Sequence, residues 1–183
     1  MKLIYCAAFG MLGLLSCNQS TTTSSSADTT KPADTPAEES VTYAYTIEHP
    51  DQWEPGSKKN TETALNALKA FETGDVAGSM KYWGDSIKIE FDNYEAKLSN
   101  DSLKATFTAW RAGLKEEKIT MQDFESVISK DKTKEYVSLW YKETKTDSKG
   151  VVDSVECMDD LLFKDGKIIL LNEKTRRLGP AKK

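Results

Sequence analysis

The spacing of hydrophobic positions changes along this chain, and each change predicts a different kind of segment. In residues 1–16, apolar side chains follow one another almost without interruption after Lys2. Residues 18–40 contain no aromatic or large aliphatic side chain, and eleven of the 23 are Ser or Thr. From residue 41 onwards, apolar residues recur at the spacings typical of strands and helices. We therefore expect the folded part of the chain to begin there.

Apolar residues three and four positions apart predict a helix from Asn60, the expected N-cap, to Gly74. A second, shorter helix is expected after Asp75, and a third after residues 99–101. The second would carry on its buried face Val76, Met80 and Trp83. The third would carry Leu103, Phe107, Trp110 and Leu114.

Alternation of apolar and polar residues predicts strands at residues 41–47 and 87–91, separated by a loop at 49–59 anchored by Trp53. After Lys118 the period of two persists and predicts four more strands: 119–130, 134–147, 151–164 and 167–176. Hairpin signals at 147–150 and 165–166 separate the later ones. This order predicts an α+β fold, with helices first and an antiparallel meander after them.

The N-terminal segment has the character of an export signal, because a dozen apolar residues follow Lys2. That run is too short to span a bilayer. Residues 14–17, Leu-Leu-Ser-Cys, resemble a bacterial lipobox. The resemblance implies that Cys17 is lipidated and anchors the protein in the cell envelope, with Asn18 favouring the outer membrane and a domain facing the periplasm. The alternative is an ordinary secretory signal cleaved near Cys17.

The net charge and the small numbers of His and Cys residues exclude several classes of binding site. With 25 Lys and Arg against 29 Asp and Glu, the net charge is −4, so no nucleic-acid partner is expected. The single histidine, His49, excludes a His-rich metal site, and no metal or cofactor motif is present. Besides Cys6 and Cys17, only Cys157 occurs, within a predicted strand, where a buried and inert thiol is expected.

Three segments resemble the nuclear transport factor 2-like superfamily, which includes the SnoaL-like polyketide cyclases and ketosteroid isomerases. They are residues 67–75 (ALKAFETGD), 82–87 (YWGDSI) and 162–168 (LFKDGKI). The resemblance implies a cone-shaped α+β domain, with three N-terminal helices packed on a curved antiparallel sheet around an apolar pocket. None of the segments is a catalytic motif, so the resemblance implies a fold rather than an activity.

The chain is therefore expected to divide into five parts. These are a signal peptide (1–16), the lipidated Cys17 with a disordered tether (17–40), an extended lead-in (41–59), the nuclear transport factor 2-like domain (60–178) and a basic tail (179–183).

Family enzymes place an inward acid in the pocket, and Asp159 is the candidate here. It shares a strand face with Cys157 and Leu161, whereas Asp160 must point the other way. The alternative is that Asp159 lies where the sheet bends out to solvent. On the last strand, either Asn172 or Glu173 faces inward. The remaining candidates for the pocket wall are Tyr82, Trp83, Trp110 and Trp140, for which a simple core role is the alternative.

Three functions remain open from the sequence. The first is a membrane-anchored module that binds a small apolar ligand or a protein partner without catalysis. The second is a SnoaL-like isomerase, cyclase or hydrolase with Asp159 as general base. The third is a structural lipoprotein whose pocket is filled by Trp83, Trp110 and Phe163. Since Trp140 and Tyr141 face opposite sides, one of them lies on the outer sheet face, where the resemblance implies a homodimer contact.

Overall fold

The computed structural model describes residues 42–48, 52–92 and 94–177. The predicted signal peptide, Cys17, the tether, His49 and the tail at 179–183 lie outside these residues. The chain divides into two compact units, residues 1–45 and 46–183, and every described helix and strand belongs to the second. In the described ranges, no helix is long and apolar enough to cross a membrane.

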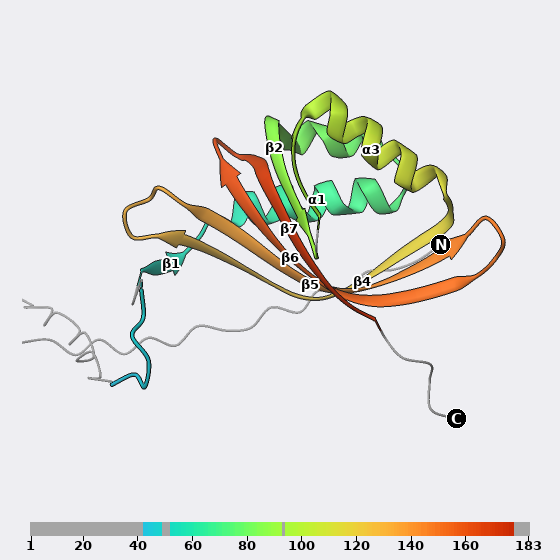
Figure 1. Ribbon diagram of the computed structural model, residues 1–183. Coiled ribbons are helices and arrows are strands. Elements are labelled where there is room, and N and C mark those ends of the chain that lie inside the picture. The colour runs from blue at the N-terminus through green and yellow to red at the C-terminus, as the bar shows by residue number, and fades with distance from the viewer. Residues whose placement is uncertain (1–41, 49–51, 93, 178–183) are drawn as a thin grey trace, which may run out of the picture. The chain divides into compact units, whose positions relative to one another are not determined.

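Seven strands form one curved sheet in the second unit, with the helices on its concave side (Figure 1). The strands are β1 (Trp53–Pro55), β2 (Trp83–Phe91), β3 (Tyr94–Ser99), β4 (Leu114–Ser129), β5 (Glu135–Asp147), β6 (Val152–Lys164) and β7 (Lys167–Arg177). Their order across the sheet is β1-β4-β5-β6-β7-β2-β3. All neighbours are antiparallel except β2 and β7, which are parallel. The predicted α+β class is confirmed, but the sheet is mixed rather than wholly antiparallel, because β2 enters beside the last strand and not beside β4.

The helices are α1 (Lys58–Glu72), α2 (Val76–Ser79) and α3 (Asn100–Ala112), with a 3₁₀ turn η1 (Met80–Tyr82) after α2. Asn60 is not the N-cap of α1. Ser57 takes that position, and its hydroxyl accepts hydrogen bonds from the backbone N–H groups of Lys59 and Asn60. At the other end, Gly74 takes a left-handed conformation (φ 85°) that ends the helix as predicted.

The four long C-terminal strands confirm the period-two prediction, but other details differ. Residues 42–48 form no strand, and Tyr43, Tyr45 and Ile47 are 45–83% exposed. Alternation alone does not make a strand where no neighbouring edge pairs with it. Trp83 begins β2 instead of continuing a helix, and Leu114 begins β4 rather than ending α3. Strands β1 and β3 were not predicted, and β1 and the start of α1 lie inside the segment 49–59 that was expected to be a loop.

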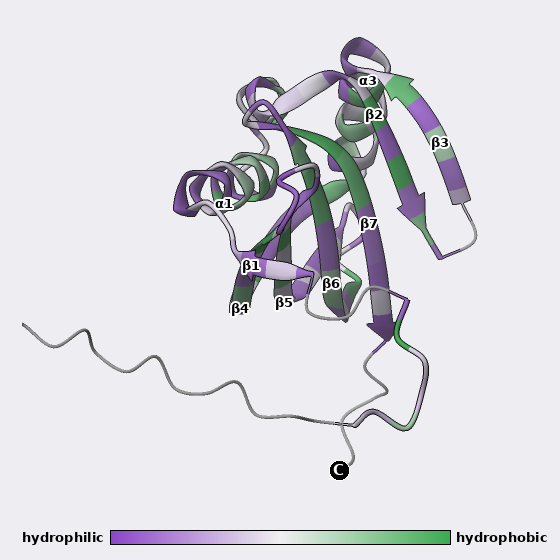
Figure 2. Cartoon of the chain, turned by 90° about the vertical axis from the view of Figure 1, so that its left-hand side faces the viewer, coloured by the Kyte–Doolittle hydropathy of each residue, from purple (hydrophilic) through white to green (hydrophobic). Residues whose placement is uncertain are grey.

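The hydrophobic core lies between the helices and the concave face of the sheet. Figure 2 shows that α1 is hydrophobic towards the sheet and hydrophilic on its outer side. The fully buried side chains at the centre are Ala64 of α1, Ile87 and Ile89 of β2, Leu103 of α3, Val137 and Leu139 of β5 and Ile168 of β7. Because the sheet is curved, this packing does not fill the whole of its concave side.

Candidate functional site

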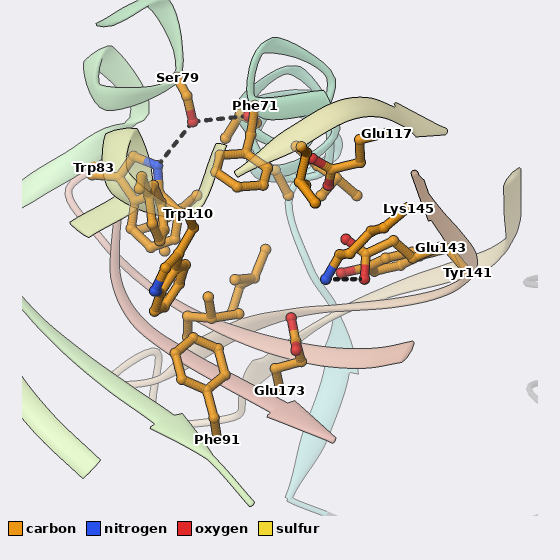
Figure 3. Close-up of a pocket in the computed structure, with 18 residues that line it drawn as sticks. Phe71, Ser79, Trp83, Phe91, Trp110, Glu117, Tyr141, Glu143, Lys145 and Glu173 are labelled. Atoms are coloured by element: carbon orange, nitrogen blue, oxygen red, sulfur yellow. Dashed lines mark hydrogen bonds and ion pairs between the residues drawn. The ribbon is translucent and has the colours of Figure 1, made fainter. Parts of the chain in front are cut away.

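A cavity of about 390 Å³ remains between the helices and the concave face of the sheet. Figure 3 shows aromatic side chains on one side of it and a group of charged side chains on the other. The apolar lining consists of Ala64, Ala67, Leu68, Phe71, Trp83, Phe91, Phe107, Trp110, Leu114, Leu161, Ile168 and Leu171. The polar lining consists of Ser79, Glu117, Tyr141, Glu143, Lys145 and Glu173. The two sides have different chemistry.

The aromatic side is a connected group of rings centred on Phe107 of α3. Its ring centroid lies 5.1 Å from that of Phe71, 5.5 Å from Trp83 and 5.6 Å from Trp110. Phe91 meets Trp110 edge-on at 5.5 Å. Such edge and tilted contacts hold the rings in fixed positions and present a rigid apolar wall. Trp110 is 44% exposed, so this wall extends from the core to solvent.

Ser79 fixes the orientation of Trp83 at the inner end of this wall. Its hydroxyl accepts a hydrogen bond from Trp83 Nε1 at 3.3 Å and donates to the carbonyl of Ala67 at 2.9 Å. Both bonds are buried, so the polar end of the indole is satisfied inside the core. Ser79 therefore has a structural partner on each side.

The charged side is built by strand alternation. Glu143 and Lys145 continue the inward face of β5 that begins with Val137, Leu139 and Tyr141. Glu117 on β4 lies directly across from Lys145 in the register of the two strands. Glu173 on β7 joins them from the other side of the cavity floor (Figure 3). Four strand positions from three strands thus meet at one place.

Glu117 is 6% exposed and is held beside Arg111 of α3. Arg111 donates to the backbone carbonyls of Phe71, Glu72 and Leu114 at 3.1–3.3 Å, and its Nε lies 3.5 Å from Glu117 Oε2. As a carboxylate, Glu117 accepts no hydrogen bond at either oxygen from the described residues. Burial, followed by a hydrogen bond to Glu143 and its negative charge, raises the pKa of Glu117 to about 8. At neutral pH Glu117 therefore holds a proton.

Glu143, which is buried, and Lys145, whose side chain is 42% exposed, form an ion pair with Nζ 2.7 Å from Oε2. Burial lowers the pKa of Lys145, but the hydrogen bond and charge of Glu143 outweigh it and the net shift is upward. Cys157 Sγ lies 3.9 Å from Glu143, and burial followed by the charges of Glu173 and Glu143 raises the pKa of this thiol far above its ordinary value. Cys157 is buried, as the sequence predicted, and its raised pKa favours the protonated thiol.

Asp159 and Glu173 lie opposite each other on β6 and β7. Asp159 is 4% exposed, and its Oδ2 accepts a hydrogen bond from Tyr141 Oη at 3.0 Å, while Oδ1 has no partner among the described residues. Burial and then the charge of Glu173 raise the pKa of Asp159 well above its ordinary value. Burial and then the charge of Glu143 raise the pKa of Glu173 to about 7. Two like charges at this position would repel, so the pair retains a proton.

Some of the residues predicted to form the pocket line the cavity, and others lie outside it. Trp83 and Trp110 line the cavity, whereas Asp159 lies behind its wall. The alternative that Asp159 faces solvent is excluded by its burial. Tyr82 lies in η1 and packs against the edge of the core outside the cavity. Trp140 is on the outer face, because its neighbour Tyr141 points inward.

Asn172 also points to the outer face, where its Nδ2 donates to Glu90 at 2.5 Å, and Glu173 is the inward residue. A register shift opposite residues 162–163 of β6 makes Ile169 an extra residue in β7. Ile168 and Leu171 consequently share the buried face. Correcting the alternation for this bulge assigns Glu173 to the cavity.

Glu117, Glu143 and Lys145 were missed from the sequence. A signal for two of them was present, since Glu143 and Lys145 occupy the inward phase of a strand whose other inward residues are apolar. Glu117 precedes residue 119, where the strand was expected to begin, and β4 starts five residues earlier, at Leu114. Among the described residues, no three His, Cys, Asp or Glu side chains are arranged to hold a metal ion.

No family model and no curated protein sequence matches this chain. Solved structures do match it. AusH from Aspergillus nidulans is 18% identical with a TM-score of 0.54, covering 67% of this chain and 87% of its own. An epoxide hydrolase of M. tuberculosis described as LEH-like is 10% identical and also has a TM-score of 0.54. That match covers 66% of this chain and 84% of the hydrolase.

A third match is an NTF2-like protein of unknown function from Exiguobacterium sp. 255-15. It is 15% identical with a TM-score of 0.52, and the match covers 62% of this chain and 98% of that protein. At these identities the likeness concerns the fold alone. It agrees with the seven-stranded curved sheet and the helices over its concave face. Residues 53–177 therefore have the nuclear transport factor 2-like α+β cone fold.

Proposed function

We propose that this protein binds a small, largely apolar molecule that carries one polar group, and that it does so without catalysis. The observation that carries the proposal is the cavity of about 390 Å³, with a rigid aromatic wall facing a group of carboxyl groups. Binding sites for small molecules have this composition, in which apolar walls supply most contact area and a few polar groups orient the ligand. An open volume also speaks against the purely structural alternative, in which Trp83, Trp110 and Phe163 fill the pocket.

Fluorescence titration with N-phenyl-1-naphthylamine, an uncharged apolar probe, tests the proposal. Leu68 lines the cavity from α1, so we expect Leu68→Trp to occupy the space and weaken probe binding by about tenfold, or ~1.4 kcal/mol. Leu65, one turn away and packed against the core outside the cavity, is the matched control. Equal probe binding by Leu68→Trp and Leu65→Trp would place the probe elsewhere and contradict the proposal.

A second candidate function is general acid–base catalysis, and it is favoured by Glu173. Asp159, the base expected from the sequence, is behind the wall, but Glu173 lines the cavity and has a pKa of about 7. A carboxyl group with a pKa near the working pH is suited to proton transfer. Among proteins with this fold, one is named as an epoxide hydrolase. Hydrolysis of styrene oxide that is abolished by Glu173→Gln would support catalysis, whereas unchanged turnover by that variant would exclude Glu173.

The cellular setting follows from the leader segment, and we propose a lipid anchor at Cys17 in the bacterial envelope, with the domain facing the periplasm. The support is the apolar run at residues 3–15 followed by Ser16 and Cys17. In cells, Cys17→Ser is expected to abolish lipidation and release the protein from membranes. Membrane association of the variant equal to that of the wild type would contradict the anchor.

The outer face of the sheet is the proposed homodimer contact, since Trp140 and its cross-strand neighbour Met158 lie there, half-buried. Analytical ultracentrifugation of the wild type and of Trp140→Glu tests this. The proposal requires a dimer that the substitution converts to a monomer.

A further inference from the structure

The cavity wall carries more negative groups than positive ones. Glu117, Glu143 and Glu173 line it against a single cation, Lys145, and Lys145 is already paired with Glu143. Behind the wall, Asp159 adds a fourth carboxyl group, and Arg111 a second cation, 3.5 Å from Glu117. Four carboxyl groups thus lie near two basic side chains. The excess negative charge is neutralised by protons bound to the carboxyl groups, and a bound cation could neutralise it in their place.

Glu117 is the cavity-lining carboxyl group whose oxygens lack a hydrogen-bond donor among the described residues. It is 6% exposed, it lines the cavity, and neither of its carboxyl oxygens accepts a hydrogen bond from the described residues. A buried carboxylate without a hydrogen-bond donor is costly, and a donor from a ligand would remove that cost. Besides the Arg111 guanidinium at 3.5 Å and the neighbouring carboxyl group of Glu143, the described residues offer Glu117 no further donor at the edge of this open volume.

From this geometry we propose that the ligand is an organic cation: a primary alkyl or arylalkyl amine whose ammonium group binds Glu117 and Glu173 and whose apolar body lies against the aromatic wall. This inference rests on the proposed binding function and names the ligand class for the same cavity. An ammonium group offers three donors, which suits two carboxylates that line the same cavity. Charge-assisted hydrogen bonds of this kind are about twice as strong as neutral ones.

The aromatic wall fits the same class of ligand. Phe91 and Trp110, on the side that adjoins Glu173, present ring faces and edges to the cavity (Figure 3). Rings of this kind attract a cation as well as an alkyl chain. An anionic ligand would bring a further negative charge to a group of carboxyl groups that already outnumber the nearby cations, which disfavours fatty acids and other carboxylates. A neutral alcohol would gain the apolar contacts without the charge.

Three probes of equal chain length separate these cases: decylamine, 1-decanol and decanoate. Isothermal titration calorimetry of each with the full chain, at pH 8.5, compares a cation, a neutral molecule and an anion with the same apolar body. At that pH an alkylammonium group remains protonated, and Glu117, with its pKa near 8, is mostly ionised. We expect decylamine to bind ~10-fold more tightly than decanol, a ratio that corresponds to one charge-assisted contact, and decanoate to bind most weakly.

Variants locate the effect. Glu117→Gln and Glu173→Gln should each weaken decylamine binding by ~10-fold and leave decanol binding unchanged, because Gln keeps the shape but removes the charge. Glu116→Gln is the matched control, since Glu116 is the exposed neighbour of Glu117 on the same strand and loses the same formal charge. Circular dichroism spectra that superimpose on the wild type establish that each variant is folded.

The outcomes are distinct. Decanol binding as tight as decylamine, or a decylamine affinity that neither Gln variant changes, overturns the amine assignment and leaves the apolar binding site in place. Absence of binding by all three probes overturns the binding function and the amine assignment together. Equal losses in Glu116→Gln and Glu117→Gln would show a non-specific charge effect and also overturn the assignment.

Discussion

The acidic side chains on the two faces of the sheet differ in how fully they are hydrogen-bonded. On the outer face, Asp160 accepts hydrogen bonds from Ser138 Oγ at 2.6 Å and Lys174 Nζ at 3.1 Å, and Arg176 Nε donates to Glu156 at 3.0 Å. On the inner face, Asp159 has one donor, Tyr141, and one oxygen without a partner. Asp159 and Asp160 are adjacent in the sequence, and they differ only in the face of the sheet to which their side chains point.

This difference is informative because burial increases the free-energy cost of a charge that has no partner. An exposed carboxylate is solvated, so its ion pairs add little to stability. A buried one must be neutralised or paired, and the inner acids achieve this largely by holding protons, as the raised pKa values of Glu117, Asp159 and Glu173 indicate. A surplus of buried acids beside an open cavity destabilises the fold, and residues of that kind are characteristic of functional sites.

The largest contrast is expected between two arginines. Arg111→Met removes the buried partner of Glu117 and three hydrogen bonds to carbonyl oxygens, so we expect the free energy of unfolding to fall by about 3 kcal/mol. Arg176→Met removes the outer-face ion pair with Glu156, whose arginine side chain is 74% exposed, and we expect no measurable change. Urea unfolding of both variants measures the contrast. Equal effects would mean that the inner charges contribute no more than surface charges.

The next effect is a dependence of stability on pH. The pKa values of Glu117 and Glu173 rise on folding from about 4.5 to about 8 and about 7, so the folded chain retains protons that the unfolded chain releases. The free energy of unfolding should therefore fall as the pH rises from 4.5 to 8, by roughly 2 kcal/mol after relaxation of the site. Unfolding at pH 5, 6.5 and 8 measures it.

The double variant Glu117→Gln/Glu173→Gln should remove the part of this slope that these two groups contribute, since Gln does not titrate, and leave the part contributed by Asp159, whose pKa is also raised on folding. Asp160→Asn, on the outer face, should keep the slope of the wild type. If the double variant retains the full slope, other groups hold the protons.

The smallest contrast compares two hydrogen bonds to adjacent aspartates. Tyr141→Phe leaves Asp159 with no donor inside the core, so we expect a loss of about 1–2 kcal/mol. Ser138→Ala removes the bond to Asp160, which keeps Lys174 and access to water, and the loss should stay below about 0.5 kcal/mol. Thermal unfolding at pH 7 distinguishes the two, and a larger loss from Ser138→Ala would reverse the comparison.

Much of the fold could be predicted because strand and turn signals are local. The four long strands, the αL glycine at residue 74 and the inward direction of Asp159 follow from alternation and from single residues with special backbone geometry. The N-cap of α1 could not be assigned this way, because Ser57 and Asn60 are both good caps. The choice is made by Glu135 of β5, whose carboxylate accepts the N–H of Ser57 at 2.7 Å.

The sequence by itself determined the four long strands after residue 119 and the opposite directions of neighbouring acids, because side-chain direction in a strand has a period of two. Only the tertiary structure decided that Glu117, Glu143 and Glu173 face one cavity, that β2 lies parallel to β7, and that a bulge turns Glu173 inward. These features depend on cross-strand register and on how completely the helices fill a curved sheet. Both are set by contacts between residues far apart in the chain, which no local pattern records.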